Sequence, residues 1–237
     1  ETLPVFVSGT EFSCRDDLGK YHVLGYAYDI GSEAVRGLMS AVHEVRMQKV
    51  INRMRFLQEK FGFVFSGEEM DALLKHHNPG KPHIAGLMIR HGYADTISEA
   101  IERYIDHYHG PERRIHPEEA IEAILAGGGI PVLAHGPFGD GEQDLDKKEM
   151  LSRVERLREA GLMGVEAFYS GYAQAHQDMM LDIANRYELL VTAGSDYHGA
   201  NKLVRLGNTG IATREEINER IRDFFEEATR RTSEYFI

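Results

Sequence analysis

The stretch LLVTAGSDYHG, residues 189–199, indicates both the class of fold and the place of the chemistry. Its first residues are apolar without alternation, which is typical of a strand buried on both faces of a parallel sheet. The run then ends in two polar residues, Asp196 and His198, with glycines on either side. Because residues i and i+2 of an extended chain point to the same side, we expect these two side chains to converge just beyond the carboxyl end of the strand. Active sites of α/β proteins usually lie there.

This stretch closes a regular alternation of helices and strands that begins at residue 115. The apolar runs IPVLAHG and MGVEAFYSG, at 130–136 and 163–171, are also expected to be strands. Amphipathic helices are expected between and after the three runs, at 116–129, 146–161, 174–188 and 213–231, the last with a capping box at Thr213 and Glu216. Such alternation implies parallel strands joined by right-handed crossovers, as in an α/β barrel or an open sheet.

Two extended segments are expected near the start of the chain, at 5–8 and 22–28. The polar segment CRDDLGK, rich in turn-forming residues, separates them. We expect Glu11 to follow the first strand and His22 to begin the second. Both residues are potential metal ligands.

A long helix is expected next, capped by Ser32 and ended by Gly62. Residues 63–114 carry only short helical patterns and no strand signal. We therefore interpret them as a small helical insertion domain within a domain formed by residues 1–62 and 115–237.

Composition limits the classes of function. The chain has 237 residues, 42% of them hydrophobic, and no apolar run long enough to span a membrane. Cys14 is the only cysteine, which excludes an internal disulfide and favours a cytoplasmic location. The net charge of −11 disfavours binding to anionic membranes or long duplex nucleic acid. A small phosphorylated ligand would need local cations or metal ions.

Potential metal ligands recur in or beside the predicted strands. His135 ends the strand at 130–136, Glu166 lies within the next strand, and Asp196 with His198 follows the last. Imidazole with carboxylate is the ligand set of Zn²⁺, Mn²⁺ or Fe²⁺ rather than of Ca²⁺.

Each of these residues also has a structural interpretation. A lone histidine such as His22 is more often a hydrogen-bonded loop residue, and Glu166 could pair with a basic neighbour. Asp196 and His198 favour function more strongly, because burying two polar groups at a strand end otherwise costs free energy.

The motifs taken together resemble the Polymerase and Histidinol Phosphatase (PHP) family, in its branch of small stand-alone phosphoesterases. The motifs occur in the order of that family and are SGTEFSC, YHVLGY, GKPHIAGLMIRHGY, AGGGIPVLAHG, GVEAFY and GSDYHG. The resemblance covers the chain from Val5 to about Gly210. It implies a distorted seven-stranded (β/α) barrel with up to three divalent metal ions, of Mn, Zn or Fe, at its carboxyl-end mouth.

The resemblance also implies roles for particular residues. Glu11 matches a carboxylate that bridges two metals, and His22 with His135 matches histidines on the second metal. Asp196 matches a ligand of the first metal, and His198 matches a ligand of the third. Glu11, Asp196 and His198 would thereby be catalytic, through a hydroxide generated from water by the metals.

The matching segment of the insertion would bind the substrate phosphate. His83 matches a histidine directed toward that phosphate. Lys81 stands where the family usually has an arginine, and it keeps the charge but loses the two-pronged geometry. Lys81 and His83 are thus the predicted substrate-binding residues.

One departure from the family concerns the start of the chain. The family begins with a His-x-His pair and an Asp-His-Asp segment on its first two strands, and neither occurs here. We expect about two βα units to precede Glu1 in the native protein. Without them, the chain should bind metal poorly and be weakly active at best.

The implied function is metal-dependent hydrolysis of a phosphate monoester or terminal phosphodiester. The substrate would be a nucleotide, a nucleoside bisphosphate or a short oligonucleotide, including 5′–3′ exonuclease action. Two alternatives remain open: a histidinol-phosphate phosphatase, and an inactive nucleotide-binding or regulatory module. A purely structural role for the histidines is the least specific interpretation.

Overall fold

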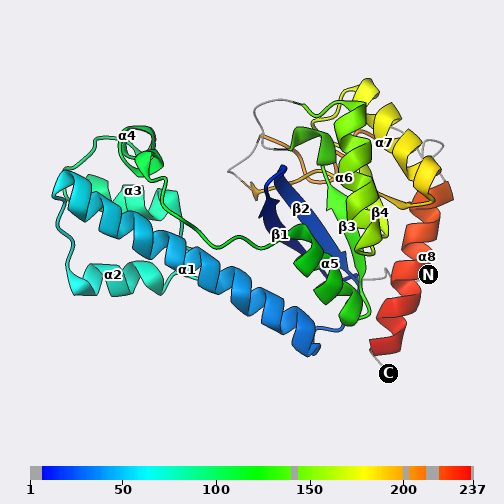
Figure 1. Ribbon diagram of the computed structural model, residues 1–237, viewed down its shortest axis with the longest axis horizontal. Helices are drawn as coiled ribbons and strands as arrows, with labels where there is room; N and C mark the ends of the chain where they lie inside the picture. The colour runs from blue at the N-terminus through cyan, green and yellow to red at the C-terminus, as the bar shows by residue number, and fades with distance from the viewer. Residues whose placement is uncertain (1–6, 140–143, 200–202, 212–218, 236–237) are drawn as a thin grey trace. The chain divides into compact units, whose positions relative to one another are not determined.

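The computed structural model describes residues 7–139, 144–199, 203–211 and 219–235. Contacts divide the chain into two compact units, which Figure 1 displays. The sheet unit consists of Glu1–Leu38 and Ile115–Ile237, and the helical unit consists of Met39–Arg114. Among the described residues, no helix is both long and apolar enough to cross a membrane.

A five-stranded mixed sheet forms the centre of the sheet unit, with its strands in sequence order. The strands are β1 (Gly9–Asp16), β2 (Gly19–Tyr26), β3 (Ile130–Ala134), β4 (Gly164–Tyr169) and β5 (Leu190–Gly194). β1, β2 and β3 pair antiparallel, whereas β3, β4 and β5 pair parallel. The parallel half agrees with the alternation in the sequence. Closure into a barrel stays a prediction, because β1 and β5 are the edges of the sheet that the described strands form.

The β1–β2 hairpin differs from its prediction. The first strand runs to Asp16, so Glu11 lies inside it, and His22 lies inside the second strand rather than at its start. Residues 5 and 6 of the predicted first strand lie outside the described part, and residues 7 and 8 are not in a strand. The Asp16 carboxylate accepts the backbone N–H groups of Leu18 and Gly19, which tightens the turn between the strands.

Helices cover both faces of the sheet. Helix α5 (Pro117–Ala126) packs on β1, β2 and β3, while α7 (Gln174–Tyr187) packs on β4 and β5. Helix α6 (Lys147–Glu159) begins with a capping box between Asp146 and Glu149. Helix α8 (Glu219–Tyr235) packs with Ile130, Val132 and the half-buried side of β2. The capping box expected at residues 213 and 216 lies outside the described residues.

The helical unit has its own core. It contains α2 (Gly67–Leu74), α3 (Lys81–Arg90), α4 (Ile97–Arg103) and a short 3-10 helix, Ile105–His107. It also takes most of α1 (Glu33–Phe61), which ends at Gly62 with a φ of +70°.

The helical unit begins earlier in the chain than residue 63, where we expected the insertion to start. Met54 and Leu57 of α1 pack with Ile84 and Leu87 of α3 in one buried cluster. Contacts therefore assign α1 from Met39 onward to the helical unit. Its last residue, Arg114, is also the last residue of the predicted insertion domain, 63–114, which stays a prediction.

Candidate metal centre

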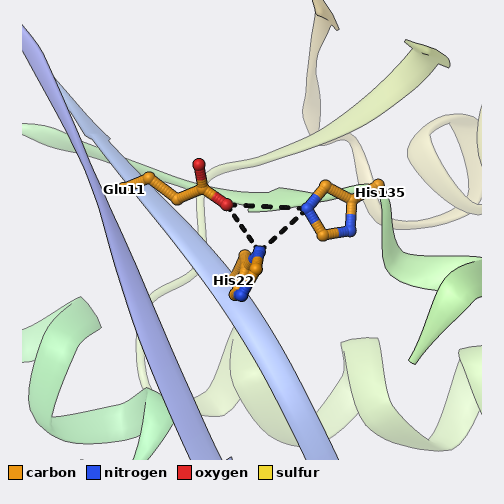
Figure 2. Close-up of side chains that lie close together, drawn as sticks. All are labelled: Glu11, His22 and His135. Carbon is orange, nitrogen blue, oxygen red and sulfur yellow. Dashed lines mark hydrogen bonds and ion pairs between the residues drawn. The ribbon is translucent and has the colours of Figure 1, made fainter. Parts of the chain in front are cut away.

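Three predicted metal ligands lie together at one edge of the sheet unit. Figure 2 shows the carboxylate of Glu11 and the rings of His22 and His135 turned toward a common point. His22 Nδ1 lies 2.5 Å from Glu11 Oε1 and 3.0 Å from His135 Nε2. His135 Nε2 lies 3.6 Å from the same Glu11 oxygen. We call these three residues the ligand cluster.

Strand register explains why the cluster forms. Ser13 of β1 lies opposite His22 of β2, and Glu11 lies opposite Leu24. Glu11 and His22 are therefore diagonal neighbours on the same face of an antiparallel pair, within reach of long side chains. His22 also lies opposite Ala134, the last residue of β3, so His135 follows directly beside it.

The charges of the cluster depend on one another. Hydrogen bonds from His135 and His22 hold the pKa of the Glu11 carboxyl far below its ordinary value. Burial opposes protonation of His135, but its hydrogen bond to Glu11 and the nearby acidic charges outweigh burial and raise its pKa. The cluster thus attracts positive charge, in the form of a proton or a metal ion.

The donor set suits a divalent transition ion. Two imidazole nitrogens and one carboxylate oxygen face one point, and these are ligands of Zn²⁺, Mn²⁺ or Fe²⁺. Ligand atoms bonded at about 2.0–2.1 Å to a tetrahedral ion lie about 3.3 Å apart. The separations in the cluster, 2.5, 3.0 and 3.6 Å, fall on both sides of this value. The other ring nitrogen of His22 lies 3.3 Å from Ser13 Oγ. Such an outer partner orients a ligating histidine.

Glu166 supports the cluster from within β4. Its Oε2 accepts the backbone N–H of His135 at 2.9 Å, and the side chain is buried. This bond holds a residue that has the left-handed φ of +30°, which is strained for any residue except glycine. Burial raises the pKa of Glu166 to about 7. Among the described residues, no basic side chain lies at hydrogen-bond distance from the Glu166 carboxylate, in contrast to the pairing with a basic neighbour that was the structural alternative.

Gly194 at the end of β5 makes room for that carboxylate. A Cβ atom at this position would collide with Glu166 Oε1. The glycine was visible in the sequence as part of GSDYHG, but its steric role depends on the pairing of β4 with β5. Sequence patterns alone could not reveal that contact.

Asp196 lines the same cavity as His22 and His135. Its φ is +49°, so it sits in a strained conformation just beyond β5. Tyr169, at the end of β4, donates its hydroxyl proton to Asp196 Oδ2 at 2.9 Å. Burial and that bond raise the pKa of Tyr169, so the hydroxyl keeps its proton. Tyr169 is a residue of this region that the sequence analysis did not single out.

His198 lies beside Asp196 but outside the ligand cluster. Its Nδ1 is 3.0 Å from Asp196 Oδ1, and 53% of its side chain is exposed, against 15% for Asp196. The convergence expected from the i, i+2 spacing therefore holds for this pair. Neither residue belongs to the group of three whose ligand atoms face one another.

Lys81 and His83 belong to the helical unit, where both lie in the first turn of α3. Lys81 Nζ forms an ion pair of 2.5 Å with Asp106. His83 Nδ1 accepts the backbone N–H of Gly80 at 3.3 Å, and its ring lies against that of His76. Their role in binding substrate stays a prediction.

Comparison with known proteins finds sequence relatives that act on phosphoester bonds. The chain is 27% identical over 217 residues to a phosphoribosyl 1,2-cyclic phosphate 1,2-diphosphodiesterase of Eggerthella lenta, covering 86% of this chain and 76% of that protein. It is 23% identical over 206 residues to a 5′-3′ exoribonuclease of Haemophilus influenzae, covering 85% and 72%. No protein-family model matches the sequence.

Solved structures share the fold. A Bifidobacterium adolescentis protein, assigned as a metal-dependent phosphoesterase, superposes with a TM-score of 0.69 at 24% identity over 93% of this chain and 76% of that one. A Chromobacterium violaceum amidohydrolase, solved with bound sulfate, gives a TM-score of 0.67 at 18% identity over 95% and 77%. At these identities the structural likeness concerns the fold alone.

Proposed function

We propose that this protein is a metal-dependent phosphoesterase of the PHP type. The observation that carries the proposal is the convergence on one point of Glu11 and His22, from one hairpin, and His135, which is 113 residues beyond His22. The phosphoester-cleaving relatives support the same reaction class. Mn, Zn and Fe are the candidate metals, because the donor set combines imidazole with carboxylate.

The ligand cluster would hold a divalent ion, and Asp196 with His198 would hold further ions beside it. Bound ions would supply positive charge to phosphoryl oxygens and acidify a water molecule for attack on phosphorus. Tyr169 keeps Asp196 oriented toward the cavity through its hydroxyl proton. Glu166 fixes the backbone of His135, and Ser13 orients the ring of His22. These contacts hold the donor atoms in position before a metal binds.

The substrate class that we propose is a nucleotide, a nucleoside bisphosphate or a short oligonucleotide carrying a terminal phosphate. Lys81 and His83 of the helical unit would bind a phosphate of this substrate. A cytoplasmic location stays the prediction that the single cysteine supports; that residue, Cys14, is buried in β1.

Metal loading followed by assay tests the proposal. The native protein, including any βα units that precede Glu1, is expected to release phosphate from adenosine 3′,5′-bisphosphate when loaded with Mn²⁺, Zn²⁺ or Fe²⁺, and its Asp196→Ala variant is expected to lose this activity. Histidinol phosphate, assayed in parallel, tests the alternative phosphatase. Full activity of chelator-treated protein, or of Asp196→Ala, would refute the mechanism. Tight binding of adenosine 3′,5′-bisphosphate by metal-loaded protein without turnover would favour the inactive module.

A further inference from the structure

Two arginines one turn apart on α6 have different partners. Arg156 forms ion pairs with Asp16 and Glu118 and donates to the Tyr21 hydroxyl at 3.0 Å. Arg153 is half-buried, yet among the described residues it has no carboxylate partner. In a chain of net charge −11, a half-buried arginine without an acidic partner requires an explanation.

The guanidinium of Arg153 is nevertheless held in place. It lies over the Tyr21 ring, with its central carbon 5.0 Å from the ring centre, and it donates to the backbone carbonyl of Leu18. A guanidinium has five N–H donors, so one hydrogen bond and one ring contact leave donors for a further acceptor. Stacking on a ring also reduces the entropy that the side chain loses when it binds a ligand.

Arg153 lines the cavity that contains the candidate metal centre. This cavity has a volume of about 310 Å³, and its lining includes Lys20 and Arg153 as well as His22, His135 and Asp196. Tyr21 and His22 are consecutive in β2, so their side chains leave opposite faces of the strand. The cavity therefore extends from the ligand cluster, around the end of β3, to the side on which Arg153 lies.

We propose that Arg153 binds an anionic group of the substrate other than the phosphate held at the ligand cluster. This inference rests on the proposed function and adds a second anion subsite to it. A phosphate is the group that fits best, because a guanidinium donates two parallel hydrogen bonds to its oxygens. Substrates with two separated phosphates would thereby be preferred over those with one.

The test uses Arg153→Met with Arg158→Met as the matched control. Arg158 lies on the same helix, carries the same charge and also stacks on a tyrosine, Tyr187, at 5.3 Å. Chelator-treated protein is titrated with inorganic pyrophosphate by calorimetry. Arg153→Met is expected to weaken binding at least tenfold, Arg158→Met less than twofold, and Arg153→Lys by an intermediate factor. Equal affinity in wild type and Arg153→Met, or equal losses in both Met variants, would overturn the proposal.

A kinetic measurement on metal-loaded protein locates the subsite. The kcat/KM of Arg153→Met for adenosine 3′,5′-bisphosphate is expected to fall at least tenfold through KM, while that for AMP changes less than threefold. Equal losses on both substrates would place Arg153 at the metal-held phosphate and overturn the second subsite. If wild type hydrolyses neither substrate, the proposed function fails, and the pyrophosphate titration still decides whether Arg153 binds an anion.

Discussion

Two polar clusters join the β1–β2 hairpin to the rest of the sheet unit, and they differ in how their charges are balanced. At the hairpin tip, Arg156 bridges Asp16 and Glu118 and contacts Tyr21. We call this the tip cluster. It contains its own permanent cation. The ligand cluster lies farther along the same hairpin and contains one carboxylate and two imidazoles but no permanent cation.

The difference separates a structural site from a candidate binding site. Buried Asp16 in the tip cluster gains stability from a partner within the chain. In the ligand cluster, two ring nitrogens face each other at 3.0 Å beside a carboxylate, an arrangement that a shared proton or a metal ion stabilises. The tip cluster is therefore neutralised within the chain, whereas we expect a proton or a metal ion to complete the ligand cluster.

The largest expected effect follows from removing a ligand. His135→Ala should weaken binding of Mn²⁺ or Zn²⁺ at least about a hundredfold, because one of three facing donor atoms is lost. Isothermal titration calorimetry measures the metal affinity, and circular dichroism checks that the variant is folded. Undiminished metal affinity would show that the cluster is not the metal site.

The tip cluster should respond in the opposite way. Arg156→Met should destabilise the sheet unit by about 1–3 kcal/mol, because the buried Asp16 loses its cation, with the partial exposure of Arg156 reducing the effect. Metal affinity should stay within threefold of wild type. Urea unfolding measures the change in the free energy of unfolding, and hydrogen exchange at the β1 and β2 amides measures the change in the hairpin. A large loss of metal affinity with normal stability would contradict this division of roles.

Metal binding by the ligand cluster should depend on pH. The hydrogen bond to Glu11 and nearby acidic charges raise the pKa of His135, so its imidazole keeps a proton to a higher pH than an ordinary histidine does. Metal binding needs that imidazole neutral, and affinity should therefore fall about tenfold per unit as pH drops below the raised pKa. The stability of the metal-free protein changes with pH in the opposite direction. The contribution of His135 to that stability is complete below the pKa of the unfolded state and is lost as pH rises through the pKa of the folded state. Metal affinity independent of pH between 6 and 8 would contradict this assignment.

The smallest effect concerns the support of the ligand cluster. Glu166→Ala should weaken metal binding about three- to tenfold, because the strained backbone of His135 loses its acceptor. Glu166→Gln keeps an oxygen acceptor and should stay within threefold of wild type. Metal titration of both variants tests the role. Equal losses in both would mean that the charge of Glu166, rather than its hydrogen bond, matters.

The parallel half of the sheet was predictable because its strands are apolar runs without alternation; β3 is buried throughout and β4 nearly so, whereas β5 is fully buried only at Val191 and Thr192. Runs such as LLVTAG and IPVLA need no partner information to be recognised as central strands, and His135 and Asp196 follow from their carboxyl ends. In the hairpin, buried Phe12, Cys14 and Asp16 alternate with outward polar residues. In the sequence, these polar residues resemble a turn. The first strand was therefore expected at 5–8, nearer the start of the chain than β1 lies.

The contacts between strands were not predictable from patterns. The diagonal placement of Glu11 and His22 depends on a register set by the turn after Asp16. The assignment of α1 to the helical unit depends on which core receives Met54 and Leu57, and helical periodicity does not specify the partner. The space that Gly194 leaves for Glu166 likewise exists only in the paired sheet.

The most direct measurement is anomalous diffraction from crystals of the protein grown with manganese or zinc. We expect one peak within bonding distance of Oε1 of Glu11, Nδ1 of His22 and Nε2 of His135, with any further peaks beside Asp196. A map in which those three side chains stay together around no ion, or in which the ions bind elsewhere on the chain, would contradict this expectation.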